Sequence, residues 1–275
     1  MRVDLHTHTN ASDGNLLPGE LIFQAEQAGV EMLAITDHDS VAAYSQLETK
    51  KNISVQLIKG IEISSRWKKM GVHIVGLNVD INNAGLKAAI KKQQKIRTTR
   101  AKLIADKLQS QGFENVLEGT YKIAGDAAIG RLHFAHYLIA IGAVKNYNAA
   151  FKKYLGDNKL GEAKNEWETM SQAIQWIDGS GGKAVLAHPA KYKLTHAKME
   201  QLIADFAAAG GHAIEVVSGL QTQEISQRLA KLAEQYHLLA SSGSDFHRPG
   251  QSWAALGAQS ELPKTCRPVW EEWIQ

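Results

Sequence analysis

Two histidines and an aspartate near the N-terminus could hold a metal ion. His6 and His8 end a short apolar run, and Asp13 follows one loop later. Residues i and i+2 of a strand point to the same face, so both imidazoles can aim at one point. The turn around Asp13 can bring a carboxylate back to that point. Taken alone, this spacing favours a surface strand that carries incidental histidines.

The same pattern recurs five more times along the chain. Each time, a ligand-type side chain ends or interrupts an apolar, strand-like run. Asp, Glu and His are costly to bury unless they are paired or coordinate a metal. A core histidine would explain any one of these positions, but not the whole set. The candidate ligands are His6, His8, Asp13, His38, Glu62, His73, His188, Asp245 and His247.

The ligand types indicate which metals would bind. Nine groups exceed what a single ion takes. Mixed imidazole and carboxylate ligands favour Mn²⁺, Fe²⁺ or Zn²⁺ over Ca²⁺. The chain has one cysteine, Cys266, so a structural zinc site built from clustered thiolates is excluded.

Composition places the chain among soluble globular proteins. It has 275 residues, 44% of them apolar and 21% charged, which suits one large domain or two small ones. A lone thiol excludes an internal disulfide framework and suits a reducing compartment. No signal region precedes the first motif, and no apolar run is long enough for a membrane helix. We therefore expect a cytoplasmic protein with no membrane contact and no obligate protein partner.

The first and last thirds of the chain alternate strand-like and helix-like segments. Such alternation indicates a parallel sheet covered by helices, in which residues at the carboxyl ends of strands meet. The strand-like runs are 3–5, 30–35, 53–58, 61–65, 72–80, 184–187, 213–217 and 238–241. The helix-like segments are 18–28, 41–47, 171–178, 196–209 and 222–236.

The middle of the chain differs in pattern and in charge. Residues 81–164 carry apolar side chains at helical spacings, and we expect an all-helical insertion there, with the barrel formed by 1–80 and 165–275. The insertion contains 15 basic and 6 acidic residues, a net charge of +9, and the remainder carries −6. A solvated helical face would explain this charge, but a basic cap that attracts a polyanion fits it better, given phosphate chemistry at the ligands.

The ligand series resembles the PHP (polymerase and histidinol phosphatase) superfamily of metal-dependent phosphoesterases. The resemblance extends to Gly130–His133, Gly181–Pro189 and Ser244–Trp253, and covers nearly the whole chain. It is close to the branch that includes ribonuclease AM, a 5′→3′ exoribonuclease, and the nucleoside 3′,5′-bisphosphate phosphatases. The resemblance implies an α/β fold, an irregular seven-stranded (β/α) TIM-like barrel.

The resemblance also implies three divalent ions, with Mn²⁺ favoured and Fe²⁺ or Zn²⁺ as alternatives. The first would be held by His6, His8, Glu62 and Asp245; the second by Glu62, His73 and His188; the third by Asp13, His38 and His247. Metals about 3.5–4 Å apart can share a hydroxide that attacks phosphorus and can clamp both the attacking and the leaving oxygen.

Other residues are candidates for supporting roles. Asp37 neighbours His38 and is expected to orient a ligand or transfer a proton, although it could also cap a helix. His133 is likewise expected to support a ligand or to transfer a proton. Related proteins usually have proline where Leu132 stands, which affects the aim of His133. The expected phosphate contacts are Arg97, Arg100, Arg131 and Lys191, the last replacing an arginine of the relatives.

The predicted function is hydrolysis at RNA 5′ ends, on short oligoribonucleotides and on nucleoside 3′,5′-bisphosphates. Two alternatives stay open. One is a small-molecule phosphatase of the histidinol phosphate type, which the basic insertion disfavours. The other is a non-catalytic RNA-binding module with a structural metal, which the complete ligand set disfavours. Trp253 could stack a base, whereas Trp270 and Trp273 are expected in the core.

Overall fold

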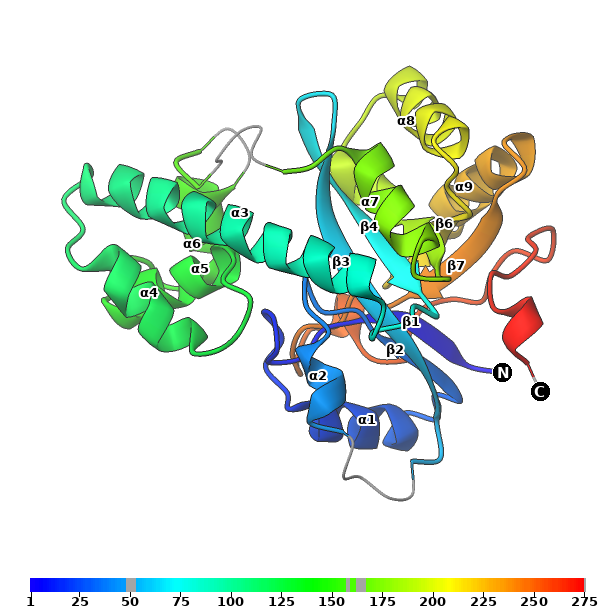
Figure 1. The fold of residues 1–275 in the computed structure, drawn as a ribbon, viewed down its shortest axis with the longest axis horizontal. Helices are drawn as coiled ribbons and strands as arrows, with labels where there is room; N and C mark the ends of the chain where they lie inside the picture. The colour runs from blue at the N-terminus through cyan, green and yellow to red at the C-terminus, as the bar shows by residue number, and fades with distance from the viewer. Residues whose placement is uncertain (48–52, 157–158, 162–166, 275) are drawn as a thin grey trace.

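One curved sheet organises the molecule, as Figure 1 shows. The computed structural model describes residues 1–47, 53–156, 159–161 and 167–274. In these ranges seven strands pair in chain order. They are β1 (Val3–Thr7), β2 (Met32–Ile35), β3 (Gln56–Trp67), β4 (Met70–Leu77), β5 (Lys183–Leu186), β6 (Ala213–Ser218) and β7 (Leu239–Gly243).

The sheet is mixed, so the parallel pairing expected from the alternation of segments is found in only part of it. Strands β1 to β3 are parallel, as are β5 to β7, but β4 runs antiparallel to both β3 and β5. The cause lies in the turn between β3 and β4, which contains only Lys68 and Lys69. Lys68 has a φ of 55°, and so short a connection can join only antiparallel neighbours.

The strand-like runs 53–58 and 61–65 form a single strand, β3, that passes through Gly60. A Cβ at Gly60 would lie 3.1 Å from the carbonyl oxygens of both Ile35 and Gly76 on the neighbouring strands. Glycine therefore allows the close backbone approach that keeps β3 continuous between β2 and β4. This continuity places Glu62 in the middle of the strand.

The segment after β7 returns to β1 and nearly closes the sheet into a barrel. The Asp245 N–H donates to the His6 carbonyl at 2.8 Å, and the His8 N–H donates to the Phe246 carbonyl at 2.9 Å. Asp4, fully buried in β1, accepts hydrogen bonds from the backbone N–H groups of Ser244 and Gly257. The predicted seven-stranded irregular barrel is confirmed.

Helices cover the outside of the barrel. They are α1 (Pro18–Gln27), α2 (Ala42–Ser45), α7 (Met170–Asp178), α8 (His196–Ala208) and α9 (Gln223–Gln235), with short 3-10 turns at Pro189–Tyr192, Ser252–Ala254 and Glu271–Trp273. In α1, Leu21, Ile22 and Ala25 recur at helical spacing and pack on Leu33 and Ile35 of β2. The helix predicted at 41–47 is shorter than expected. No helix in the described ranges is long and apolar enough to cross a membrane.

A second group of helices extends to one side of the barrel (Figure 1). It contains α3 (Ala84–Gln109), α4 (Val116–Ala124), α5 (Arg131–Ala140), α6 (Tyr147–Ala150) and a π-helical turn at Phe151–Leu155. Ile104, Leu108, Phe134 and Leu138 contribute to a hydrophobic cluster of its own. Leu86, near the start of α3, packs in a barrel cluster instead. Helix α3 therefore joins the two parts. The predicted boundary at 164/165 touches residues outside the described ranges.

Two of the tryptophans lie at the end of the chain, where core positions were expected. Trp270 is buried in the cluster that includes Val3 and Leu5 of β1, and Trp273 packs partly against that cluster. Trp253 is 56% exposed.

Replacing Asp4 with alanine tests how much the closure of the barrel contributes to stability. The variant leaves two backbone N–H groups unpaired, and we expect the free energy of unfolding to fall by about 3 kcal/mol. Urea denaturation measures the change. Asp178→Ala removes a carboxylate that is 69% exposed and should cost no more than about 0.5 kcal/mol. Equal stability of the Asp4 variant and the wild type would contradict this role.

Candidate metal centre

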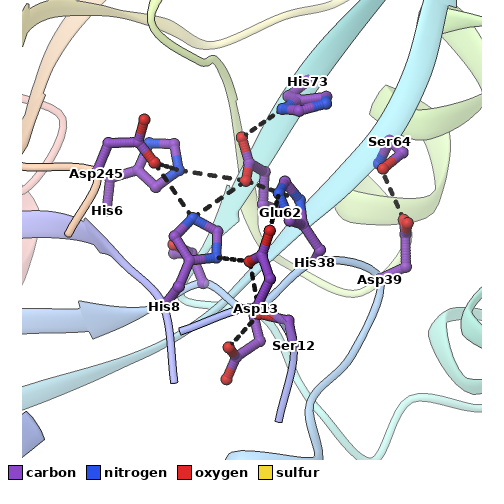
Figure 2. Close-up of polar contacts among 12 residues, drawn as sticks. His6, His8, Ser12, Asp13, His38, Asp39, Glu62, Ser64, His73 and Asp245 are labelled. Carbon is purple, nitrogen blue, oxygen red and sulfur yellow. Dashed lines mark hydrogen bonds and ion pairs between the residues drawn. The ribbon is translucent and has the colours of Figure 1, made fainter. Parts of the chain in front are cut away.

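Glu62 lies at the centre of a cluster of imidazole rings. Its side chain is almost completely buried, at 1% exposure. Figure 2 shows ring nitrogens facing both of its oxygens. Distances from a carboxylate oxygen to the nearest ring nitrogen run from 2.9 to 3.3 Å, for His6, His8, His38, His73 and His188.

These side chains come from strand ends that the barrel brings together. His6 lies in β1 and His8 just beyond it, with ring centroids 5.2 Å apart. The other positions that follow parallel strands are His38 after β2, His188 after β5, and Asp245 with His247 after β7. His73 comes from the antiparallel strand β4, opposite Ser64 of β3. His73 and Glu62, which both lie within strands, are exceptions to the rule that barrel sites form at the carboxyl ends of strands.

The nine predicted ligands converge, in four overlapping groups of ligand atoms that lie within 4.8 Å of one another. The groups are His8, Asp13, His38 and His247; His6, Glu62 and His188; His6, His8 and Asp245; and His38, Glu62 and His73. The predicted third set, Asp13, His38 and His247, occurs together and gains His8. The other two predicted sets do not recur as such. His6, His8 and Asp245 form one group without Glu62, and Glu62 lies with His188 in a second group and with His73 in a third.

The cluster passes a chemical test for metal binding. Within the described part of the chain, Nε2 of His6, Nε2 of His8 and Nδ1 of His38 face Oε2 of Glu62 at 3.0–3.3 Å, yet none of these buried atoms has a hydrogen bond. Buried polar atoms of this kind are expensive unless something satisfies them. A cation accepts lone pairs from imidazole and carboxylate alike, and divalent ions suit this mixture. The residues present therefore fit divalent metal binding.

The electrostatics of the cluster lead to the same conclusion. Burial alone would raise the pKa of Glu62, but the rings of His38 and His6 hold it well below its usual range. Burial likewise opposes a charge on His8, yet Asp245 and Glu62 raise its pKa to about 10. Glu62 is thus ionised, and protons on the His6 and His8 rings balance its charge, whereas burial lowers the pKa values of His38 and His188. Metal binding must displace those protons, since only a neutral imidazole coordinates.

Glu215 is a buried site residue that the sequence analysis missed. It lies in β6, and its Oε2 accepts hydrogen bonds from Nδ1 of His6 at 3.1 Å and from the backbone N–H of His188 at 2.6 Å. A His6 ring that donates through Nδ1 presents the lone pair of Nε2 to the cluster. The signal was in the sequence, because Glu215 interrupts the apolar run 213–217 as the candidate ligands interrupt theirs.

Asp37 is buried against the loop that carries Asp13. Its oxygens accept hydrogen bonds from the Thr9 backbone and hydroxyl, and from the Ser12 hydroxyl, at 2.6–2.7 Å. These contacts hold the turn that leads to Asp13. Asp37 therefore supports the cluster indirectly, because it holds the loop that carries Asp13.

A cavity of about 170 Å³ connects the cluster with the helical insertion. Asp13, His38 and His73 line it together with Arg97, Arg100, Arg131, Leu132, Phe151 and Trp167. The Arg100 guanidinium lies 4.5 Å from the centre of the Trp167 ring, and that of Arg131 lies 5.9 Å from the centre of Phe151. Arg97 is 7% exposed and forms an ion pair with Asp39.

Lys191 and His133, the other two candidates for substrate contacts, are not among the residues that line this cavity. Lys191 Nζ is 2.6 Å from Oδ2 of Asp245, so it lies beside the ligand cluster. His133 is buried near the start of α5, where its Nδ1 accepts a hydrogen bond from the Gly130 N–H at 3.0 Å. Burial lowers the pKa of His133, which favours the neutral ring.

Residues 4–218 match the PHP domain, and the chain belongs to the PHP family. Among its relatives, the 5′-3′ exoribonuclease Rnm of Escherichia coli K12 is 42% identical over 275 residues, covering 99% of this chain and 94% of the relative. A 3′,5′-nucleoside bisphosphate phosphatase of Chromobacterium violaceum is 38% identical over 272 residues, with 98% and 95% covered.

Solved structures that resemble this chain support the same family assignment. A Chromobacterium violaceum protein described as an amidohydrolase, with bound sulfate and no metal, has a TM-score of 0.91 at 37% identity, covering 99% of this chain and 95% of that one. A Bifidobacterium adolescentis protein described as a metal-dependent phosphoesterase has a TM-score of 0.80 at 26% identity, with 97% and 92% covered. The chain is an enzyme, a metal-dependent phosphoesterase, as predicted.

Glu215→Gln tests the support that β6 gives to the cluster. The amide keeps the size of the side chain but cannot accept both hydrogen bonds with a charged oxygen. We expect metal affinity to fall about 10–100-fold. Competition with a chelator of known affinity, followed by metal analysis, measures this loss. Glu224→Gln changes an exposed residue of α9 and should bind metal as the wild type does. Unchanged affinity in the Glu215 variant would remove its role.

Proposed function

We propose that the enzyme degrades RNA from its 5′ end and hydrolyses the 3′ phosphate of nucleoside 3′,5′-bisphosphates. The observation that supports this most directly is the cavity between the ligand cluster and the arginines. If a terminal 5′ phosphate is anchored at the arginine end, the ester at the 3′ oxygen of the same nucleotide faces the cluster. The same pose then serves an RNA chain and a single nucleotide.

The ligand cluster supports catalysis through divalent ions. Three ions, with Mn²⁺ favoured over Fe²⁺ and Zn²⁺, would supply a nucleophile at neutral pH and offset the charge of the phosphate. The protein side chains hold that assembly: Glu62 is shared between groups, while Asp13 and Asp245 contribute negative charge from the two opposite ends of the chain. Lys191 holds Asp245 in place and adds a positive charge beside the phosphate.

Arg100 and Arg131 are proposed to anchor the 5′ phosphate. A guanidinium group can grip a phosphate with two parallel hydrogen bonds. The Arg100 guanidinium lies over the Trp167 ring, and that of Arg131 lies over the Phe151 ring. His133, neutral because of burial, is the proposed proton donor or acceptor near the leaving oxygen.

Residues 81–164 are proposed to act as a substrate cap on a barrel formed by 1–80 and 165–275. The cap is strongly basic and the rest of the chain is acidic. A basic surface raises the local concentration of a polyanion and speeds its encounter with the site. We propose short oligoribonucleotides as substrates, and the cytoplasm, where a lone cysteine stays reduced, as the compartment.

An RNA substrate with and without a 5′ phosphate tests the anchor. We expect a 5′-monophosphorylated oligoribonucleotide to be degraded about 10–100-fold faster than the same sequence with a 5′ hydroxyl, the value of a charge-assisted contact. Rates come from gel analysis of 3′-labelled RNA under kcat/KM conditions. Equal rates for the two RNAs would exclude the 5′ anchor.

Asp13→Ala and His188→Ala test the assignment of the cluster. Each removes one ligand from a different group, so we expect hydrolysis of a nucleoside 3′,5′-bisphosphate to drop by more than about 100-fold while the fold survives. Phosphate release and circular dichroism measure the two properties. His196→Ala, at the exposed start of α8, is the matched control and should keep full activity. Activity near wild type in either ligand variant would refute the assignment.

A further inference from the structure

Asp39 joins the ligand cluster to the insertion. It directly follows the candidate ligand His38 and is fully buried. Its backbone N–H donates to the carbonyl of Glu62 at 2.8 Å, and its φ of 48° lies in the left-handed region. A non-glycine residue keeps that conformation only where its surroundings fix it. The backbone at Asp39 is therefore held against β3, beside the central carboxylate.

The side chain of Asp39 reaches from the barrel to helix α3. Oδ1 accepts hydrogen bonds from the Ser64 N–H and from Nε2 of Gln93, both at 2.9 Å. Oδ2 accepts from Nε of Arg97 at 2.7 Å. Figure 2 shows Asp39 turned toward Ser64 and away from the imidazole rings. Its carboxylate thus serves the contact between β3 and α3.

Arg97 extends the same network to the start of α5. Its remaining nitrogens donate to the Ser64 hydroxyl and to the Ile129 carbonyl, both at 3.0 Å. Ile129 immediately precedes Gly130 and Arg131. Because the edges of the guanidinium are divided among protein acceptors, Arg97 does not present an undivided fork to a phosphate. This differs from the phosphate contact expected from the sequence.

We propose that Asp39 and Arg97 are a positioning pair that fixes the distance between the metal ligands and the phosphate-anchoring arginines. The pair connects the ligand loop after β2 with both insertion segments that carry anchors: α3, which bears Arg100, and the start of α5, which bears Arg131. It thereby matches the enzyme to substrates whose two phosphates are one nucleotide apart. This inference rests on the proposed function.

The pair differs from a simple structural contact in what it controls. The insertion also touches the barrel elsewhere, where the Ala128 N–H donates to the Ala11 carbonyl and Arg248 stacks on Tyr147. Loss of the pair should therefore shift the anchors without detaching the insertion. A substrate that uses both ends of the cavity will detect the shift, and one that uses only the cluster will not.

The test compares two nucleotides in the double variant Asp39→Asn/Arg97→Gln, which leaves no uncompensated buried charge. Adenosine 3′,5′-bisphosphate requires both ends of the cavity, and adenosine 3′-monophosphate lacks the distal phosphate. We expect KM for the bisphosphate to rise about tenfold or more, with kcat changed by less than about threefold. KM for the monophosphate and the metal content should stay at wild-type values.

Two further variants make the result specific. Arg97→Lys keeps the charge opposite Asp39 but cannot reach Ser64 and Ile129 together, so its KM for the bisphosphate should lie between those of the wild type and the double variant. Arg267→Gln breaks an exposed arginine–carboxylate pair of 2.8 Å and should change neither KM.

Three outcomes would overturn the inference. KM could rise equally for both nucleotides, kcat could fall together with metal content, or the double variant could behave as the wild type. In the second case the pair would support His38 instead of the anchors. A wild-type enzyme that hydrolyses neither nucleotide would refute the proposed function itself, which separates the two failures.

Discussion

A buried carboxylate surrounded by imidazole rings is the constraint on which the site depends. Glu62 has five rings within 3.3 Å and almost no exposure to solvent. An ionised carboxylate in such a place needs positive charge nearby, because water cannot supply it. Without metal, protons on rings such as His8 provide that charge. Divalent cations provide it better, since they also use the lone pairs of the neutral rings. Metal binding is thus built into the electrostatics of the core.

The contacts that close the barrel also bring the metal ligands together. The β1 and β7 strands stand at opposite ends of the strand order. The hydrogen bonds that join them involve His6, His8, Asp245 and Phe246. Three of these four residues are candidate ligands, and Phe246 lies between two of them. A chain that failed to close would separate the β1 histidines from Asp245, which follows β7. The fold and the site therefore require the same contacts, and Asp4 reinforces them from the buried face of β1.

The ligands could be predicted because a polar residue that is buried with a strand interrupts or ends an apolar run in the sequence. Glu62 and His188 each break or end such a run, and only a paired or coordinating role explains that. The direction of β4 was not visible in the alternation of segments, because it is set by a two-residue turn. Asp39 was overlooked because it adjoins His38 in a motif already assigned to metal. Arg97 was expected to contact phosphate, because the docking of α3 that buries it against Asp39 is not visible in the sequence.

The junction between the two hydrophobic clusters is polar, although an apolar one would be at least as stable. A buried ion pair gains little stability over well-packed apolar side chains of similar size, because both charges lose their hydration. What it adds is direction: the Arg97 guanidinium has a planar set of donors, and each donor faces a different segment of the chain. An apolar junction would let α3 slide by fractions of a side chain. Such sliding would not matter for a surface helix. It would matter for a cavity whose two ends must match the distance between two phosphates.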